Sequence, residues 1–217
     1  MKVAAIIAAA GSGSRMGLNI NKLLIEIEGK TVIERTLDTF ENCGAVDKII
    51  IVTGDEKIAE IAKGYGKVSA VVKGGDTRQK SVLCGIEAAG DCDILCVHDG
   101  ARCFVSESII EDAVNCAKEK GACTVAIDVV DTLRVFDGDI LKQKVERSEI
   151  KSIQTPQCFK KEILLEAYEK ADGSETDESL LVSKVHPVYT VMGSRENIKI
   201  TTKQDLSMGV AIIKGGN

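Results

Sequence analysis

The sequence of 217 residues contains no tryptophan, three tyrosines, four phenylalanines and only two prolines. So few aromatic rings argue against a stacking platform for single-stranded nucleic acid. The net charge of -5 provides no global basic surface for duplex nucleic acid. No apolar run approaches the roughly 20 residues that span a bilayer. These absences predict a soluble globular protein with neither a nucleic-acid nor a membrane partner.

Eight cysteines are present, but no two of them have the C-x-x-C spacing of a zinc knuckle or a redox site. A metal site of Cys92, Cys96 and His98 can be drawn, yet alternate side chains of a strand face opposite ways. We therefore interpret the cysteines as reduced, mostly buried thiols of a cytoplasmic protein. The apolar start of the chain resembles a short signal peptide, but it leads directly into a glycine-rich segment, which favours a buried first strand.

Short apolar or β-branched runs alternate with longer helical patterns along the chain. This alternation predicts an α/β sandwich with a mostly parallel central sheet, and the length suits a single domain over residues 1–217. The predicted strands are Val3–Ala8, Lys48–Thr53, Val68–Val72, Ile94–His98, Thr124–Val129 and Val188–Met192. The predicted helices are Val32–Asn42, Glu56–Lys63, Arg78–Ala89, Glu107–Lys120 and Lys161–Lys170, and a last helix opens at Thr202.

One segment breaks this alternation. Two β-rich runs, Thr132–Phe136 and Ile140–Val145, flank an Asp-Gly pair at Asp137, which is a strong hairpin signal. A lone two-stranded hairpin is marginal in water, so it must rest on the main body or on a partner chain. We expect a β-arm over about residues 131–150.

A glycine-rich segment, Gly11–Gly17, follows the first strand, where open α/β sheets place their ligand crevice. Glycines let backbone N–H groups approach and cradle phosphates. Arg15 lies in this segment and Lys22 follows it, and with Lys2 they are the only charged side chains among residues 1–25. Met16 stands where a Rossmann fingerprint needs its third glycine, and no Gly-Lys-Ser/Thr follows. A structural turn is the alternative, but we favour nucleoside triphosphate binding.

Two further motifs follow the third and fourth predicted strands. Asp76 and Thr77 could cap the next helix. Alternatively, the Asp76 carboxylate could accept a hydrogen bond from the amino group of cytosine while Ser81 serves the base's other polar atoms. Asp99 is a natural Mg²⁺ ligand and Arg102 can bind a phosphate, unless the two form only a salt bridge within a turn. We give His98 no role, because a strand-end histidine is more often packed than catalytic.

Together these motifs resemble the 2-C-methyl-D-erythritol 4-phosphate cytidylyltransferase family of the non-mevalonate isoprenoid pathway. The matching segments span nearly the whole chain and occur in the family's order: Ala9–Met16 with Lys22, Gly74–Arg78 with Ser81, His98–Arg102, Asp131-Thr132, Arg147, Gln154–Gln157, Thr176–Glu178 and Asn197–Lys199. The chain departs from the family where Asn21 and Leu23 replace a common Pro and Gln, and where Cys103 replaces a frequent Pro.

The resemblance implies a Rossmann-like nucleotidyltransferase with a protruding β-arm that embraces a second subunit and with Mg²⁺ or another divalent cation. It assigns catalysis to Arg15 and Lys22, which would flank the triphosphate. The implied CTP-binding residues are Ala9, Ala10, Gly11, Gly13, Gly75, Asp76 and Ser81. The implied residues for the sugar-phosphate acceptor are Asp99, Arg102, Thr132, Arg147, Thr155 and Lys199, with Thr132 and Arg147 reaching the partner's site. From its place at the end of a strand we also predict Asp99 as the metal ligand.

We therefore predict a cytoplasmic, homodimeric enzyme that transfers the CMP moiety of CTP to methylerythritol phosphate by in-line attack on the α-phosphorus. The nearest alternative is ribitol-5-phosphate cytidylyltransferase, which shares the fold and most motifs, although Val145–Ser148 looks more like the methylerythritol enzyme. A non-catalytic CTP sensor is disfavoured because binding alone does not need both Arg15 and Lys22. Met16 disfavours a dinucleotide-dependent oxidoreductase.

Overall fold

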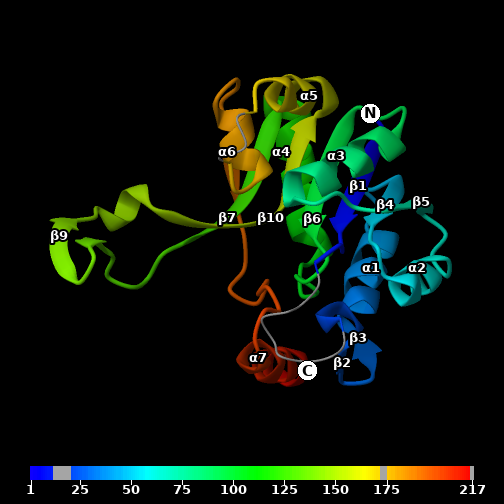
Figure 1. Cartoon of the computed structure of the whole chain (residues 1–217), viewed down its shortest axis with the longest axis horizontal. Coiled ribbons are helices and arrows are strands. Elements are labelled where there is room, and N and C mark those ends of the chain that lie inside the picture. The colour runs from blue at the N-terminus through cyan, green and yellow to red at the C-terminus, as the bar shows by residue number, and fades with distance from the viewer. Residues whose placement is uncertain (12–20, 172–174, 216–217) are drawn as a thin grey trace.

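A seven-stranded sheet runs through the molecule, with helices on both of its faces (Figure 1). The computed structural model describes residues 1–11, 21–171 and 175–215. The strand order is β11-β7-β10-β6-β1-β4-β5. The bounds are β1 (Val3–Ala8), β4 (Lys48–Val52), β5 (Val68–Val72), β6 (Ile94–Asp99), β7 (Ala122–Asp128), β10 (Lys151–Lys160) and β11 (Tyr189–Met192).

Only β10 runs against the other strands of this sheet. It pairs antiparallel with β6 and β7, whereas β1 pairs parallel with β4 and β6, β4 with β5, and β7 with β11. The predicted mostly parallel sheet is thus confirmed. The strands β1 and β6 are neighbours and point the same way, so their carboxyl ends meet at one edge, where open α/β sheets bind ligands.

The helices divide between the two faces of the sheet. Alternate residues of β1 point to opposite faces, so Ile7 packs in the same cluster as Phe40, and Ile6 in the same cluster as Val82. The helices α1 (Val32–Asn42), α2 (Glu56–Ala62) and α4 (Glu107–Lys120) cover the first face, and α7 (Lys203–Gly215) packs at its margin. The helices α3 (Arg78–Ala89), α5 (Lys161–Glu169) and α6 (Glu178–Ser183) cover the second.

Local signals in the sequence explain where the main helices begin and end. α1 begins at a complete capping box, in which Thr31 accepts from the Glu34 amide and Glu34 accepts from the Thr31 amide. α4 begins at Ser106, whose side chain caps the helix as predicted, and is followed by Gly121 with a φ of 93°. The predicted helices at these positions have the same bounds as α1 and α4.

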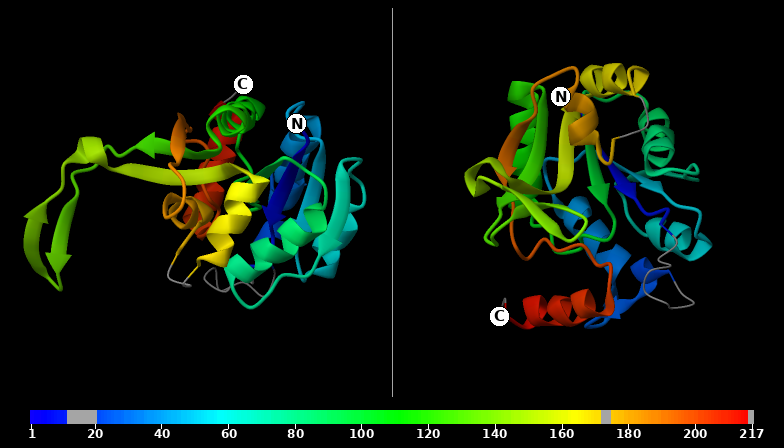
Figure 2. Two further views of the ribbon diagram at one scale, coloured as in Figure 1. Left: turned by 90° about the horizontal axis from the view of Figure 1, so that it is seen from above. Right: turned by 60° about the vertical axis from the view of Figure 1, so that its left-hand side comes forward.

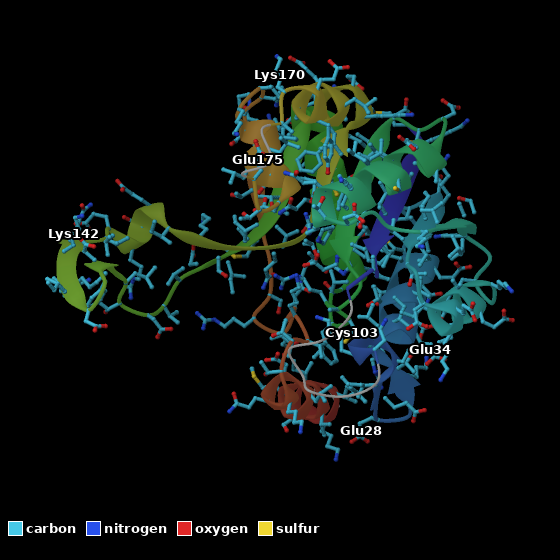
Figure 3. All side chains as sticks on the ribbon, viewed as in Figure 1. Glu28, Glu34, Cys103, Lys142, Lys170 and Glu175 are labelled. Carbon is cyan, nitrogen blue, oxygen red and sulfur yellow. The ribbon has the colours of Figure 1, made fainter. Side chains whose placement is uncertain are left out.

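The predicted hairpin is present as a separate two-stranded sheet. Its strands β8 (Arg134–Asp137) and β9 (Ile140–Lys144) pair antiparallel, with Gly138 in the turn at a φ of 57°. Figures 1 and 2 show this hairpin projecting from the body, and Figure 3 places Lys142 near its far end. Its large apolar side chains are exposed, Ile140 by 75%.

The sequence pattern does not predict β10, although this strand lies inside the main sheet. Polar residues and a proline interrupt its apolar pattern: Gln154, Thr155, Pro156 and Gln157. In the structure these three polar side chains are buried and hydrogen-bonded, and Pro156 follows a cis peptide bond where the pairing with β7 shifts register.

Five smaller elements in the described residues also lack a clear pattern because they are short: α6, β2 (Glu26–Ile27), β3 (Lys30–Thr31) and the 3₁₀ turns η2 (Lys22–Leu24) and η3 (Arg147–Glu149). The ends of the predicted elements otherwise agree with the structure to within one or two residues. No helix in the described ranges is both long and apolar enough to cross a membrane.

Candidate active site

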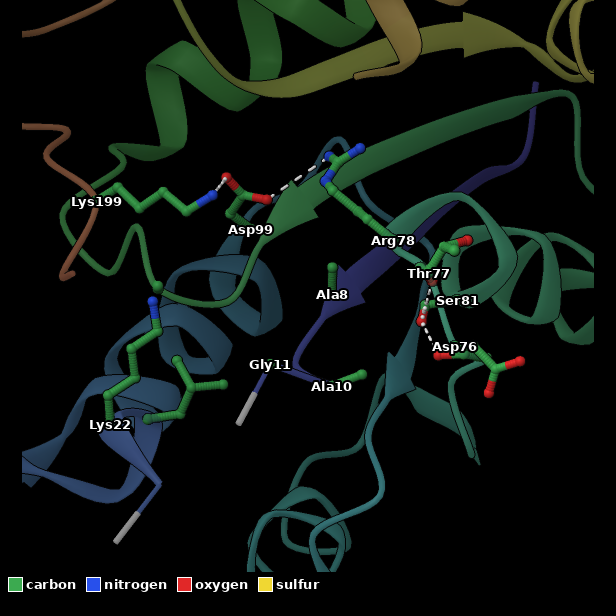
Figure 4. Close-up of a pocket in the computed structure, with 13 residues that line it drawn as sticks. Ala8, Ala10, Gly11, Lys22, Asp76, Thr77, Arg78, Ser81, Asp99 and Lys199 are labelled. Atoms are coloured by element: carbon green, nitrogen blue, oxygen red, sulfur yellow. Dashed lines mark hydrogen bonds and ion pairs between the residues drawn. The ribbon is translucent and has the colours of Figure 1, made fainter. Parts of the chain in front are cut away.

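The carboxyl ends of β1 and β6 and the start of α3 surround a cavity of about 360 Å³ (Figure 4). Eight of the predicted site residues line it, from four separate parts of the sequence: Ala10, Gly11, Lys22, Gly75, Asp76, Ser81, Asp99 and Lys199. Three other predicted residues lie just behind the cavity wall. Ala9 and Arg102 are next in the chain to lining residues, and Thr155 accepts a hydrogen bond from the Asp99 amide. The catalytic prediction for Arg15 and the CTP-binding prediction for Gly13 lie outside the described residues.

The backbone after β1 enters the cavity in a fixed position. The Ala9 amide donates to the Val52 carbonyl at 2.8 Å, and the Thr53 hydroxyl donates to the Ala9 carbonyl at 3.3 Å. The amide of Ala9 is therefore already used within the sheet, so only its carbonyl has remaining capacity for a base. Among the residues that the structure describes, none has an atom within 4 Å of where a Cβ at Gly11 would lie.

Lys22 reaches the cavity from the turn η2. The Asn21 side-chain oxygen begins this turn by accepting from the Leu23 backbone amide at 3.1 Å, and the Asn21 side-chain nitrogen donates to the Asp55 carboxylate at 3.1 Å. Leu23 is buried in the core, so the apolar residue that departs from the family pattern anchors the turn by packing. The Lys22 ammonium donates to the Ile200 carbonyl at 2.8 Å, which connects the turn to the segment that carries Lys199.

Close packing explains both glycines of the turn before α3. A Cβ on Gly74 would lie 2.7 Å from the Ser81 Oγ, and one on Gly75 would lie 2.5 Å from the Lys80 Cβ. The Ser81 hydroxyl is within donating distance of the Thr77 carbonyl at 2.9 Å and of the Gly75 carbonyl at 3.2 Å. Any larger residue at either glycine would push Ser81 or its helix out of the cavity wall.

The cap of α3 comes from Thr77 and not from Asp76. The Thr77 side chain accepts from the Lys80 amide at 3.1 Å, while the Asp76 side chain is 92% exposed and lies 3.4 Å from the Lys80 ammonium. Of the two predicted capping residues, Thr77 is therefore confirmed, and the prediction for Asp76 is wrong. Its carboxylate stands at the rim of the cavity with its acceptor capacity largely available.

Asp99 lies between cations at the end of β6. Its carboxylate accepts from the Lys199 ammonium at 2.8 Å and lies 3.6 Å from an Arg78 Nη2, and Figure 4 shows these two side chains reaching it from opposite sides. The Arg102 Nε lies 3.7 Å away. Burial alone would raise the pKa of Asp99, but Lys199 and Arg78 outweigh it and lower the pKa to about 2.

This arrangement does not suit Asp99 as a metal ligand. Its carboxylate has three cationic side chains within 4 Å, so a divalent cation would meet their repulsion and would have to displace the Lys199 ammonium. Among the residues that the structure describes, no cluster of three or more His, Cys, Asp or Glu side chains could hold a metal ion. The Mg²⁺ role predicted for Asp99 therefore gains no support from its surroundings.

Several hydrogen bonds hold the segment that presents Lys199. The Asn197 side chain is fully buried and donates to the Gln154 side chain at 3.1 Å and to the Thr155 carbonyl at 3.0 Å. The Arg102 guanidinium donates to the Asn197 carbonyl at 2.8 Å, and the Ile200 amide donates to the Ala101 carbonyl at 2.9 Å. The polar residues of β10 thus position a lysine that lies more than 40 positions later in the chain.

His98 has a positioning role that the sequence pattern does not indicate. Its Nε2 lies 3.1 Å from the Arg102 carbonyl, which can only accept, so Nε2 carries the proton. Burial lowers the pKa of His98 to about 4, so the ring is neutral and its Nδ1 accepts from the Thr155 hydroxyl at 3.1 Å. That hydroxyl in turn accepts from the Asp99 amide at 3.1 Å. Thr155 therefore braces the turn beside Asp99.

The two residues predicted to act on a partner subunit lie apart from the cavity. Thr132 is exposed between β7 and β8. Arg147 is also exposed, at the start of the 3₁₀ turn η3 (Arg147–Glu149), and donates to the Val130 carbonyl at 2.8 Å. Neither residue lines the cavity of its own chain.

The structure adds Arg78 to the residues that line the cavity. Its guanidinium donates to both carboxylate oxygens of Glu178, at 2.6 and 2.7 Å, across 100 positions of sequence. Both residues lie in the family motifs quoted above, but nothing in the sequence indicates that they pair. A basic residue in the first turn of a helix that follows a glycine turn is the signal that could have identified Arg78.

Comparisons with known proteins agree with this geometry. A family model described as 2-C-methyl-D-erythritol 4-phosphate cytidylyltransferase matches residues 3–215. A protein of that name from Clostridium novyi (strain NT) is 41% identical over 98% of this chain and 97% of its own, and one from Alkaliphilus oremlandii (strain OhILAs) is 37% identical over 98% and 95%.

Solved structures give the same result. The crystal structure of 4-diphosphocytidyl-2C-methyl-D-erythritol synthase from Anaerococcus prevotii DSM 20548 has a TM-score of 0.87 and 33% identity, covering 98% of this chain and 96% of that one. The crystal structure of 2-C-methyl-D-erythritol 4-phosphate cytidylyltransferase from Thermus thermophilus has a TM-score of 0.81 and 31% identity, covering 99% and 100%.

A mostly parallel sheet with a cavity at its carboxyl edge, lined by glycines, lysines and an arginine, is typical of a nucleotide-binding protein, and the comparisons show that this one is a nucleotidyltransferase. The chain belongs to the 2-C-methyl-D-erythritol 4-phosphate cytidylyltransferase family. The fold expected from the resemblance is confirmed.

Proposed function

We propose that this protein transfers the cytidylyl group of CTP to 2-C-methyl-D-erythritol 4-phosphate and releases pyrophosphate. The observation that carries the proposal is that Lys22, Arg78 and Lys199 line one cavity together with Gly11 and Gly75, in a chain of this family. A cavity with three cations suits a reaction in which two anionic phosphates must approach each other.

The chemistry is a single in-line displacement. A phosphate oxygen of the acceptor attacks the α-phosphorus of CTP, the new P–O bond forms, and the bond to the β-phosphate oxygen breaks as pyrophosphate leaves. Such transfers depend on positioning and on stabilisation of charge. Lys22, with Arg15, neutralises charge on the triphosphate, and Lys199, which lies in the segment that Lys22 contacts, faces the acceptor.

Cytosine is recognised at the other end of the cavity. Asp76 supports this role because Thr77 caps α3, which leaves the Asp76 carboxylate to accept a hydrogen bond from the exocyclic amino group of the base. Ser81 and the backbone of Ala9, Ala10 and Gly75 complete the base site, with Gly11 and Gly13 next to the phosphates. UTP lacks that amino group, so Asp76 favours CTP.

The acceptor site is built around Asp99, Arg102, Thr155 and Lys199. Mg²⁺ or another divalent cation remains part of the proposal as a requirement of the reaction, but no step of it is assigned to Asp99. Thr155 and Arg102 act by holding the turn at Asp99 and the segment before Lys199.

The active unit in this proposal is a homodimer of single-domain chains, residues 1–217, with arms over about residues 131–150. Phe136, Ile140 and Leu141 support it, since an isolated arm leaves these apolar side chains in water. In a two-fold symmetric dimer each arm lies across its neighbour. Thr132 and Arg147 then contribute to the acceptor site of the partner, where the Arg147 guanidinium meets the acceptor's phosphate.

Mixing two inactive variants tests the shared site. Chains with Arg147→Ala and chains with Lys22→Ala are combined under conditions in which subunits exchange. Mixed dimers hold one site with both defects and one site with neither, so activity should partly return. A mixture as inactive as its components despite verified exchange, or an active monomer, would contradict the shared site.

We place this reaction in the cytoplasm. All eight cysteines are free thiols, which suits a reducing compartment. Fractionation of the source cells with an antibody against the chain tests this placement, and recovery of the protein outside the cytoplasmic fraction would overturn it.

Turnover with two acceptors tests the function itself. Pyrophosphate release from CTP is measured with 2-C-methyl-D-erythritol 4-phosphate and, in parallel, with ribitol 5-phosphate. We expect a much higher kcat/KM with the methylerythritol acceptor. A preference for ribitol 5-phosphate would mean that the acceptor is ribitol 5-phosphate. No pyrophosphate release with either acceptor would mean that the protein binds nucleotide without catalysing the transfer.

A further inference from the structure

Glu178 is a buried carboxylate that the proposed reaction does not use. Its side chain is 1% exposed, and it lies at the first position of α6 on the face of the sheet that α3 and α5 cover. It accepts from the Arg78 guanidinium and, at 3.2 Å, from the Tyr168 hydroxyl of α5. A buried charge of this kind is expensive unless it is paired, so its partner is the reason for its position.

In the described part of the chain, the hydrogen bonds of the Arg78 guanidinium come from a single nitrogen, Nη1. Its Nη1 has two hydrogens, and both are used by the two oxygens of Glu178, at 2.6 and 2.7 Å. Its Nη2 has no comparably short partner among the described residues, because the nearest ion-pair contact, to Asp99, is 3.6 Å long. The pair with Glu178 therefore sets the rotation of the guanidinium and directs Nη2 into the cavity that Arg78 lines.

The segment before Glu178 is tied to the same helix. The Gln79 side chain donates to the Glu175 carbonyl at 3.2 Å and to the Glu175 carboxylate at 3.1 Å. Asp177 then caps α6 through the amides of Ser179 and Leu180. The first turn of α3 thus holds the start of α6 at two points, which fixes Glu178 relative to the cavity wall.

We infer that Glu178 is a positioning residue for the acceptor site: by holding Nη1 of Arg78, it presents Nη2 to the phosphate of the acceptor. The inference rests on the proposed function. Asp99 indicates which phosphate is meant, because it touches Arg78 on one side and Lys199 on the other. A phosphate that enters beside Asp99 meets both cations, and Arg78 and Lys199 bind it from two directions.

A double-mutant cycle tests the inference. KM for each substrate, kcat and the melting temperature are measured for Glu178→Gln, Arg78→Ala and the double variant. The amide in Glu178→Gln keeps the shape but loses the charge that orients Nη1. We expect KM for the acceptor to rise roughly 10- to 100-fold, the usual effect of losing a charge-assisted hydrogen bond, while KM for CTP changes several-fold at most.

The double variant separates positioning from stability. If Glu178 acts through Arg78, then Glu178→Gln should not raise the acceptor KM further once Arg78 is alanine, even if it lowers the melting temperature in both backgrounds. An undiminished effect on the acceptor KM in the Arg78→Ala background would overturn the inference. So would equal increases in KM for CTP and for the acceptor.

A matched control uses the same substitution nearby. Glu166→Gln removes an exposed carboxylate on α5 that pairs with Lys170 at 2.6 Å, and it should leave both KM values unchanged. Calorimetric titration with the acceptor gives a Kd that does not depend on turnover. A wild-type protein that binds the acceptor without turnover would overturn the proposed function, while the Kd values of the variants would still decide the role of Glu178.

Discussion

Replacing Asp99 by asparagine should remove a carboxylate on which three cationic side chains converge. Lys199 lies 2.8 Å, Arg78 3.6 Å and Arg102 3.7 Å from its oxygens. Asparagine has nearly the same shape as a protonated aspartate but cannot carry its charge. The substitution therefore leaves three cations close together without their shared counter-charge.

The size of the effect follows from the pKa of Asp99. The pKa is about 2 in the folded protein against the usual 3.8 of an aspartate, and the side chain is only 11% exposed. One pKa unit corresponds to about 1.4 kcal/mol, so the charged form stabilises the fold by about 2 kcal/mol at neutral pH. For a chain of this size that amounts to roughly 4–8 °C in Tm.

The sign of the pH dependence is fixed by the lowered pKa. The stabilisation is fully present well above pH 3.8 and is lost as the pH falls towards 2, with about half remaining near pH 3. Urea unfolding should therefore show a smaller difference in the free energy of unfolding between wild type and Asp99→Asn at pH 3 than at pH 7. Asp139→Asn, an exposed change on the arm, serves as control. An equal difference in the free energy of unfolding at both pH values, or no difference at pH 7, would show that the Asp99 charge does not stabilise the fold in this way.

Three further predictions concern single side chains. Lys22→Ala should lower kcat by about 10²–10³ while CTP binding falls less, and near-normal turnover would remove Lys22 from catalysis. Asp76→Asn should reduce the preference for CTP over UTP in kcat/KM, and an unchanged ratio would show that the base is read elsewhere. Burial raises the pKa of Cys103 to about 12, so its thiol should stay protonated and react slowly with iodoacetamide in the native protein at pH 8. Peptide mass spectrometry should find Cys103 labelled far more slowly than the less buried Cys84.

Much of the fold can be predicted from the sequence because its elements carry strong local signals. The buried strands are continuous apolar runs, and helices such as α1 and α4 have complete caps. β10 has neither signal, since its inward side chains at Gln154 and Gln157 are polar. These side chains are buried because hydrogen bonds from distant segments satisfy them, and such partners are not visible in a linear sequence.

The same limit applies to the site. Glycine turns and single charges identified the cavity wall at Lys22, Gly75 and Asp76, because each follows a predicted strand or lies in a charge-poor segment. The roles of His98 and Glu178 depend on contacts that span 57 and 100 positions of sequence, respectively. Spacing cannot reveal that His98 holds Thr155, or that Asp99 is surrounded by cations that make it a poor metal ligand.

The path of the oxygen atoms tests the proposed reaction most directly. Methylerythritol phosphate labelled with ¹⁸O in its phosphate is incubated with CTP and the enzyme, and the products are analysed by mass spectrometry. Attack of the acceptor phosphate on the α-phosphorus predicts that all of the label remains in the cytidine diphosphate-linked product and that the pyrophosphate contains none. Label in the pyrophosphate, or release of free CMP in place of the linked product, would contradict the proposed transfer.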